Sequence, residues 1–345
     1  MIEVEHLSKI YGSTAAIQDV DFSVATGEIL GFLGPNGAGK TTTMRILSGY
    51  IPATTGTARI SGYDVHEKSL EVRQRIGYLP ENPPLYPDMT VESFLTFVAS
   101  IKGIPAGDRR SKVDSAITRC QLTEKRKVLI RKLSKGYKQR VGIAQAIVHD
   151  PPVIILDEPT VGLDPKQIIE VRNLIKSLAN QHTIILSTHI LPEVSMTCDR
   201  VTIINRGKVV TTNTPDNLLA DLSSGMGYEL EIEGNTDQVQ SLLQPIAGIT
   251  QITLKPLDNR DRATIHIKTD SAQELGREIA KVLIQNGLGL YEMRRTRATL
   301  EDVFLNLITT EDPVTGSEEQ AVLTDKATSE TPELTLENRD NATHD

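Results

Sequence analysis

Long apolar runs are missing from this sequence of 345 residues. The longest candidates, Val153–Leu156 and Ile184–Leu186, have the length of a strand, whereas a helix that spans a bilayer needs ~18–20 apolar residues. We therefore expect no membrane-spanning segment. The stretch Met1–Glu5 is acidic and lacks the basic region of a secretory signal peptide, so we expect a cytoplasmic protein.

Cysteine is scarce as well. The two cysteines, Cys120 and Cys198, lie far apart and do not have the spacing of a metal site. This usage is typical of reduced thiols in a cytoplasmic protein.

The sequence also lacks the basic excess expected of a nucleic-acid-binding protein. Residues 1–310 carry 35 basic and 35 acidic residues, so the net charge of −8 comes from residues 311–345. This terminal segment is rich in Thr, Glu, Asp and Asn and cannot bury enough apolar surface to offset its ordering entropy. We predict a disordered acidic tail over residues 310–345, with a partner-binding tail as the alternative.

Short β-branched runs alternate with helical patterns as far as about residue 220. The buried runs are continuous, which is typical of strands covered on both faces by helices. The pattern predicts an α/β fold with a largely parallel sheet. Its expected strands are Gly27–Leu33, Ala58–Ser61, Arg75–Leu79, Val153–Leu156, Thr183–Ser187 and Val201–Asn205.

The strand signals stop between Glu81 and Asp150. Thr90–Lys102 and Asp108–Cys120 are predicted to be helices, the first with Thr90 as its N-cap. We therefore expect a helical subdomain over about residues 82–150, inserted into a domain that spans residues 1–222.

A second, smaller domain is predicted over residues 228–309, after a boundary in the Ser- and Gly-rich segment 223–227. Its pattern reads strand, helix, strand, strand, helix, strand, which suggests a ferredoxin-like α/β domain. The expected strands are Tyr228–Ile232, Ile249–Leu254, Ala263–Ile267 and Gly289–Arg294, and an amphipathic helix over Leu300–Leu307 is expected to close the domain, with Thr299 as its N-cap.

The strongest chemical signal is a P-loop between an apolar strand and a helical run that begins at Thr42. Its glycines let backbone N–H groups surround phosphate oxygens, and the helix N-terminus favours the anion. Lys40 can reach the β- and γ-phosphates, and the Thr41 hydroxyl can bind Mg²⁺. The predicted nucleotide-binding residues are Gly34, Pro35, Asn36, Gly37, Ala38, Gly39, Lys40, Thr41 and Thr42.

A second signal is the apolar strand Val153–Leu156, which ends in two acids. The carboxyl edge of a parallel sheet is where such folds bind ligands. Because successive residues on a strand point in opposite directions, the two acids need different roles. We expect Asp157 to hold Mg²⁺ through water and Glu158 to polarise the attacking water.

Further motifs in the same order resemble those of ABC-type ATPases, a likeness that covers residues 1–220. Leu133–Arg140 resembles the signature motif, Pro159–Asp164 the D-loop, and His189 falls at the switch histidine. Tyr11 falls where the family stacks an aromatic ring on adenine. The resemblance implies a P-loop ATPase core that binds ATP and Mg²⁺ and hydrolyses ATP.

The resemblance also implies a homodimer in which two chains enclose two ATP molecules. Ser134 and Gly136, at the start of a helix, would face the γ-phosphate held by the other subunit, although an ordinary helix cap is the alternative. Asp164 would lie at the interface and couple the sites. His189 would contact the γ-phosphate and the attacking water, with a packed or exposed histidine as the simpler alternative. For Tyr11, the simpler alternative is an ordinary tyrosine at the end of a strand.

The sequence departs from the family pattern at two places. Glu81 stands where the Q-loop normally has glutamine, and we expect it to sense the metal while adding negative charge beside Asp157 and Glu158. Lys135 and Tyr137–Lys138 replace the usual Gly and Gln of the signature motif. Because Ser134 and Gly136 remain, we still expect hydrolysis.

The segments Tyr78–Thr90 and Ala298–Phe304 resemble ATPase subunits of ABC-2-type exporters, including those linked to gliding motility. Such a subunit lies on the cytoplasmic face of the membrane and docks a helix of a separate permease. The docking surface is expected between Glu81 and about Ile101 and contains apolar or aromatic residues suited to a groove. These are Leu85, Tyr86, Met89, Phe94 and Phe97, some of which must instead pack inside the helical subdomain.

Two other functions remain open. An ABC ATPase that acts on ribosomes or DNA is disfavoured by the single cassette, the absence of long coiled coils and the neutral charge of residues 1–310. A dimer that binds ATP with little hydrolysis is disfavoured because both Glu158 and His189 are present. No nucleic-acid partner is expected.

Overall fold

The computed structural model describes residues 1–179, 181–221, 226–234, 238–256, 262–269, 274–296, 301 and 304. The predicted tail over 310–345 lies outside these ranges, as does most of the predicted helix Leu300–Leu307. No helix in the described parts of the chain is long and apolar enough to cross a membrane.

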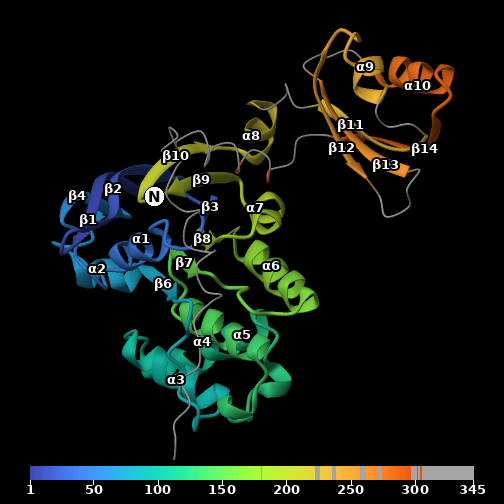
Figure 1. Cartoon of the computed structure of the whole chain (residues 1–345). Helices are drawn as coiled ribbons and strands as arrows, with labels where there is room; N and C mark the ends of the chain where they lie inside the picture. The colour runs from blue at the N-terminus through green and yellow to red at the C-terminus, as the bar shows by residue number, and fades with distance from the viewer. Residues whose placement is uncertain are drawn as a thin grey trace, which may run out of the picture.

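The centre of the first domain is a six-stranded sheet in the order β10-β9-β3-β8-β7-β6 (Figure 1). All neighbouring strands are parallel except the β9–β10 hairpin. Every residue of β3 and β7 is buried, as expected for strands covered on both faces. The predicted parallel α/β fold is confirmed. The strands are β3 (Ile29–Leu33), β6 (Ile76–Leu79), β7 (Val153–Asp157), β8 (Thr183–Thr188), β9 (Arg200–Asn205) and β10 (Lys208–Asn213).

A separate antiparallel sheet, β2-β1-β4-β5, was not expected from the sequence. It places Ala58–Ser61, assigned above to the parallel sheet, mainly in β4, which pairs antiparallel with β1. One face of this sheet packs on the six-stranded sheet and α1, giving the alternating burial seen in β2. The elements are β1 (Ile2–Tyr11), β2 (Thr14–Val24), β4 (Thr55–Ile60), β5 (Tyr63–Asp64), α1 (Lys40–Leu47) and α2 (Ser69–Arg75).

The helical subdomain lies between β6 and β7, a stretch that is fully described and contains no strand. Both predicted helices are present, and Thr90 Oγ1 accepts a hydrogen bond from Ser93 N at 3.2 Å, which confirms Thr90 as an N-cap. A second core joins this subdomain to α6 and α7 on the other face of the sheet. The helices are α3 (Val91–Ile101), α4 (Ala106–Arg119), α5 (Lys135–Ile147), α6 (Pro165–Ala179) and α7 (Leu191–Thr197), with short 3-10 turns at Thr123–Lys125 and Ile130–Lys132.

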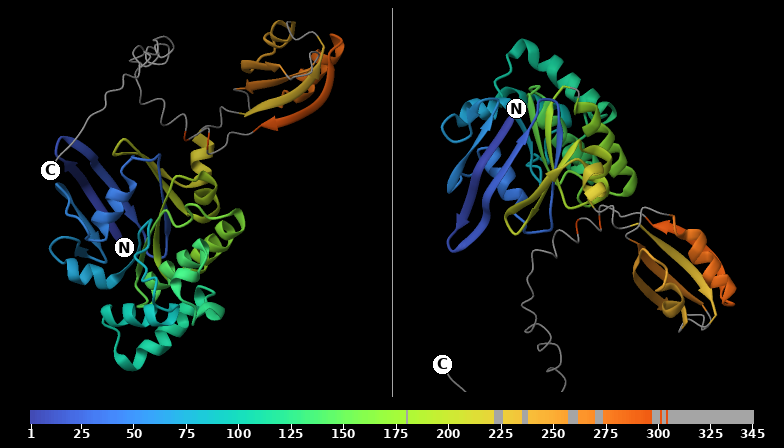
Figure 2. Two further views of the ribbon diagram at one scale, coloured as in Figure 1. Left: turned by 60° about the horizontal axis from the view of Figure 1, so that its bottom comes forward. Right: turned by 90° about the horizontal axis from the view of Figure 1, so that it is seen from above.

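After α8 (Pro215–Asp221) the chain forms a lobe with its own hydrophobic core (Figure 2). Its sheet order, β12-β13-β11-β14, with all neighbours antiparallel, is that of a ferredoxin-like split βαβ unit. The elements follow in the predicted order: β11 (Met226–Glu233), α9 (Val239–Leu243), β12 (Ile249–Pro256), β13 (Arg262–Thr269), α10 (Gly276–Gln285) and β14 (Gly289–Thr296).

Candidate functional site: a P-loop pocket with a Lys–Glu–His chain

The P-loop runs between the end of β3 and the first residue of α1, Lys40. Two of its glycines are needed for packing. A Cβ on Gly34 would lie 2.3 Å from the Ile204 carbonyl oxygen, and one on Gly39 would lie 2.7 Å from that of Ala16. Gly39 also has a φ of 106°, a backbone conformation that residues other than glycine rarely adopt. These contacts press the loop against β2 and β9.

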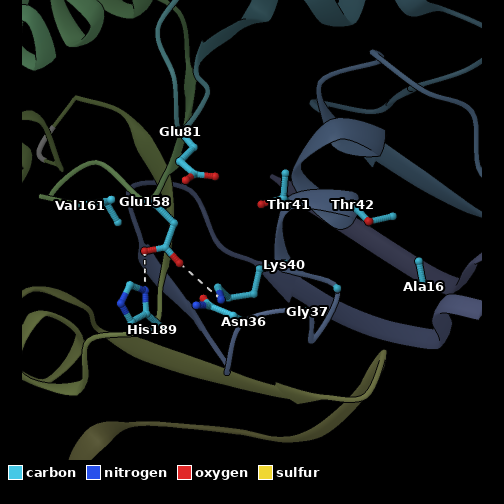
Figure 3. Close-up of a pocket in the computed structure, with 11 residues that line it drawn as sticks. Ala16, Asn36, Gly37, Lys40, Thr41, Thr42, Glu81, Glu158, Val161 and His189 are labelled. Carbon is cyan, nitrogen blue, oxygen red and sulfur yellow. Dashed lines mark hydrogen bonds and ion pairs between the residues drawn. The ribbon is translucent and has the colours of Figure 1, made fainter. Parts of the chain in front are cut away.

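A pocket of about 420 Å³ opens above this loop, and Figure 3 shows residues that line it. Most of the predicted nucleotide residues gather there, together with the loops that follow β6, β7 and β8. The lining residues are Ala16, Asn36, Gly37, Gly39, Lys40, Thr41, Thr42, Glu81, Glu158, Val161 and His189.

Lys40 is almost fully buried at 5% exposure, and it points into this pocket. Its Nζ donates to the carbonyl oxygens of Gly34 at 2.8 Å and Pro35 at 3.1 Å. The same Nζ lies 3.3 Å from Glu158 Oε1. The ammonium group is thus held at the mouth of the loop between backbone dipoles and one carboxylate.

Glu158 links Lys40 to His189 across the pocket (Figure 3). Its second oxygen, Oε2, lies 2.9 Å from His189 Nδ1, and its backbone N–H donates to the Ser187 carbonyl at 3.0 Å. The carboxylate is buried, whereas the His189 side chain is 41% exposed. The arrangement leaves the far edge of the histidine ring open to a ligand.

Asp157 lies behind Thr41, whose Oγ1 donates to Asp157 Oδ1 at 3.4 Å. Burial raises the pKa of Asp157, and the negative charges of Glu158 and Glu81 raise it further, whereas the hydrogen bond from Thr41 lowers it. A cation would relieve this repulsion. Hydroxyl and carboxylate oxygens are the ligands that Mg²⁺ prefers, so Thr41, Asp157 and Glu81 fit a magnesium ion.

Comparison with known proteins decides the family. A family model described as "ABC transporter" matches residues 17–161. The chain is 34% identical to the bacitracin transport ATP-binding protein BcrA of Bacillus licheniformis, over 89% of this chain and 97% of BcrA. The chain belongs to the ABC transporter ATP-binding family.

Further relatives agree. The daunorubicin resistance ATP-binding protein DrrA3 of Streptomyces coeruleorubidus is 31% identical over 89% of this chain and 95% of its own. A solved ATP-binding subunit of an ABC transporter is 31% identical, with a TM-score of 0.59 over 64% of this chain and 93% of that one. The predicted family, the P-loop ABC ATPase fold of the first domain and the ATPase activity are confirmed, whereas the predicted acidic tail lies outside the described residues.

Several predicted residues of this ABC ATPase do not line the pocket. Among the described lining residues, Ser134, Gly136, Asp164 and Tyr11 are absent. Ser134 is the N-cap of α5, accepting from Tyr137 N at 3.4 Å. A Cβ on Gly136 would lie 2.6 Å from Gln167 Cδ, so this glycine lets α5 approach α6.

Asp164 and Tyr11 have local roles in the single chain. Asp164 is exposed and accepts a hydrogen bond from Gln167 N at 2.9 Å, so it caps the start of α6. Tyr11 ends β1 with 48% of its surface exposed, and Lys9 Nζ lies 5.3 Å from the centre of its ring.

Other predicted residues support the loop without lining the pocket. Gly34 and Pro35 offer their carbonyl groups to Lys40, and Ala38 is buried in the core beneath. Conversely, Ala16 and Val161 line the pocket but were not predicted. Val161 lies within the D-loop, whose motif was the available signal, whereas Ala16 carries no chemical signal.

Proposed function

We propose that this ABC ATPase drives export by a transporter whose membrane-spanning permease is a separate protein. Relatives that align over nearly their whole length are named for bacitracin transport and for resistance to linearmycin and daunorubicin. Removal of a toxic compound from a cell is export, and the described parts of this chain contain no helix able to span a membrane. An ABC-2-type permease and a place on the cytoplasmic face of the membrane complete the proposal.

The observation that carries the catalytic part is the Lys40–Glu158–His189 chain inside the P-loop pocket. ATP binds with its phosphates in the loop, where Lys40 and the backbone N–H groups stabilise charge on the γ-phosphate. Glu158 orients the attacking water and accepts its proton, and His189 holds Glu158 and the γ-phosphate in place. Thr41, Asp157 and Glu81 would hold Mg²⁺, which would supply positive charge to neutralise the phosphates.

One copy of the chain does not complete this site. Ser134 and Gly136 lie at the N-terminus of the 13-residue helix α5, outside the pocket of their own chain. A helix N-terminus favours an anion. A second copy that presents α5 to the γ-phosphate would close both pockets, with Asp164 at the interface and Tyr11 against adenine.

A second hollow, of about 290 Å³, supports the permease contact. Tyr86 lies edge-on to Phe94 and Phe97, with ring centres 5.9 and 5.5 Å apart, and Tyr86 and Phe97 remain 52% and 39% exposed. Phe94 is buried, and Leu85 and Met89 pack against the subdomain core. Tyr86 and Phe97 are therefore the docking residues, and the hollow suits an amphipathic helix.

Exchange of Glu158 for Gln tests the catalytic part. The amide keeps the size of the side chain but cannot take a proton, so we expect ATPase turnover to fall by ~10²–10⁴-fold. Nucleotide binding should persist, whereas Lys40→Ala should weaken binding itself. Steady-state hydrolysis at the normal rate in Glu158→Gln would remove Glu158 as the base.

Isolation of the chain from detergent-solubilised membranes tests the transport part. We expect a protein with several membrane-spanning helices to accompany it, as identified by mass spectrometry. If the chain is instead recovered with ribosomal proteins and without a permease, the proposed function in export is wrong and an action on ribosomes is favoured.

A further inference from the structure

Glu193 is a buried carboxylate with no part in the mechanism above. It lies in the first turn of α7 and is only 4% exposed. Burying a carboxylate is unfavourable unless hydrogen-bond donors compensate. The donors around it therefore identify what this side chain stabilises.

Two buried hydroxyl groups bind the carboxylate, one on each oxygen. Thr160 Oγ1 donates to Oε1, and Thr188 Oγ1 donates to Oε2 at 2.7 Å. Thr160 and Thr188 are 3% and 0% exposed. Thr188 Oγ1 also accepts a hydrogen bond from Ile190 N at 3.1 Å, so Thr188 is fixed from both sides.

Thr160 lies in the loop that carries Glu158, and Thr188 is the last residue of β8, next to His189. Thr160 comes two residues after Glu158, in a turn closed by bonds from Val161 N to Glu158 O at 3.3 Å and from Leu163 N to Thr160 O at 3.1 Å. Thr188 directly precedes His189. A single carboxylate thus ties the loop after β7 to the end of β8, next to the 2.9 Å contact between Glu158 and His189.

On the pocket side, Glu158 is held by its ion pair with Lys40 and by the bond from its N–H to the Ser187 carbonyl, whereas the described hydrogen bonds give the His189 side chain no partner other than Glu158. Glu158 has a φ of 50°, a conformation that persists only where the surroundings impose it, and the His189 side chain is 41% exposed. We propose that Glu193 is a positioning residue for ATP hydrolysis, whose bonds to Thr160 and Thr188 fix the spacing between the loop after β7 and the end of β8 and hold His189 against Glu158. This inference rests on the proposed roles of Glu158 and His189.

Two substitutions of Glu193 distinguish the effect of its hydrogen bonds to Thr160 and Thr188 from the effect of its volume. Glu193→Met keeps the length and volume of the side chain but has no acceptor for either hydroxyl. We expect kcat to fall by ~10–10²-fold, because small misplacements of reacting groups have effects of that size, with KM for ATP within about threefold. Glu193→Gln can still accept from one threonine and donate to the other, and it should retain most of the rate.

A triple variant excludes a general loss of stability as the cause. Glu193→Met alone leaves two buried hydroxyls without an acceptor, whereas Glu193→Met with Thr160→Val and Thr188→Val makes the side chains of the cluster wholly apolar and removes, besides these bonds, only the acceptor of Ile190 N. Replacing both sides of a buried hydrogen bond by apolar groups can be nearly neutral in stability. We expect the thermal melting midpoint of the triple variant to recover towards that of the natural protein while its kcat stays as low as in Glu193→Met.

Full kcat in the triple variant, or a rise in KM with unchanged kcat in Glu193→Met, would overturn the role of Glu193. If Glu193→Met fails to fold, the triple variant supplies the same comparison. The outcome is distinct from a failure of the proposed catalytic base, because that failure shows as normal hydrolysis by Glu158→Gln.

Discussion

Glu158 carries both electrostatic contacts of the pocket on one side chain. Its left-handed backbone, with a φ of 50°, turns the carboxylate out of the strand direction at the end of β7, so that it meets Lys40 and His189. Asp157, one residue earlier, is 1% exposed and faces Thr41 instead. Adjacent acids at the end of β7 thereby face different partners, which supports the different roles proposed for them in orienting water and in holding the metal.

Glu81 provides a residue-scale test of the metal site. Glu81 and Thr41 both line the pocket (Figure 3), and the charge of Glu81 contributes to the raised pKa of Asp157. Because the charge of the ligands tunes the affinity for divalent cations, Glu81→Gln should raise the Mg²⁺ concentration for half-maximal ATPase activity about three- to tenfold. The measurement is a Mg²⁺ titration at fixed ATP.

The control for this titration is Glu67→Gln, which removes one exposed carboxylate that does not line the pocket. It should leave the Mg²⁺ requirement unchanged. Equal requirements in Glu81→Gln, Glu67→Gln and the natural protein would exclude Glu81 from the metal site.

At the scale of the elements, sequence patterns correctly predicted the motifs whose geometry depends only on residues adjacent in the sequence. The P-loop lies between β3 and α1, and the paired acids end β7, because each motif is a continuous run whose flanks determine its geometry. The antiparallel sheet and the Glu193 bridge escaped prediction. The bridge joins Thr160 to a residue 33 positions away, and a contact of this kind leaves no periodic pattern in the sequence.

The same limit applies to helix α3, which is part of the proposed docking surface. Sequence could name its aromatic residues but not say which face the core, because the core contacts come from segments outside α3. The structure buries Phe94 and leaves Phe97 exposed, together with Tyr86 in the segment before α3. Exposed aromatics that pack edge to edge are typical anchors of protein interfaces.

Introducing negative charge at Tyr86 and Phe97 should impair docking to the permease without affecting ATP hydrolysis. We expect Tyr86→Asp with Phe97→Asp to reduce co-isolation of the permease at least about tenfold, because central aromatic anchors contribute most of the binding energy. ATPase activity of the isolated chain should remain. Leu70→Asp, on an exposed leucine of α2, is the control and should keep the permease. Undiminished recovery with the double variant would move the docking surface elsewhere.

At the scale of the whole molecule, the separation of α5 from its own P-loop pocket makes the proposed active unit a pair of chains. Each copy presents its P-loop pocket and the N-terminus of its α5 on different parts of its surface. Such a complementary arrangement closes on itself in a twofold dimer, in which each contact occurs twice. ATP then acts as the link between copies, so hydrolysis would release them.

This arrangement predicts that Glu158→Gln forms a dimer with ATP and Mg²⁺, measured by light scattering after size-exclusion chromatography, and is a monomer without nucleotide. Adding Ser134→Asp should abolish the dimer. Aspartate is as good an N-cap as serine, so α5 keeps its cap, but its negative charge would face the partner's γ-phosphate. The matched control is Thr90→Asp, the same change at the N-cap of α3, which should still dimerise. A Ser134→Asp protein that dimerises as readily as the control would show that α5 does not close the partner's pocket.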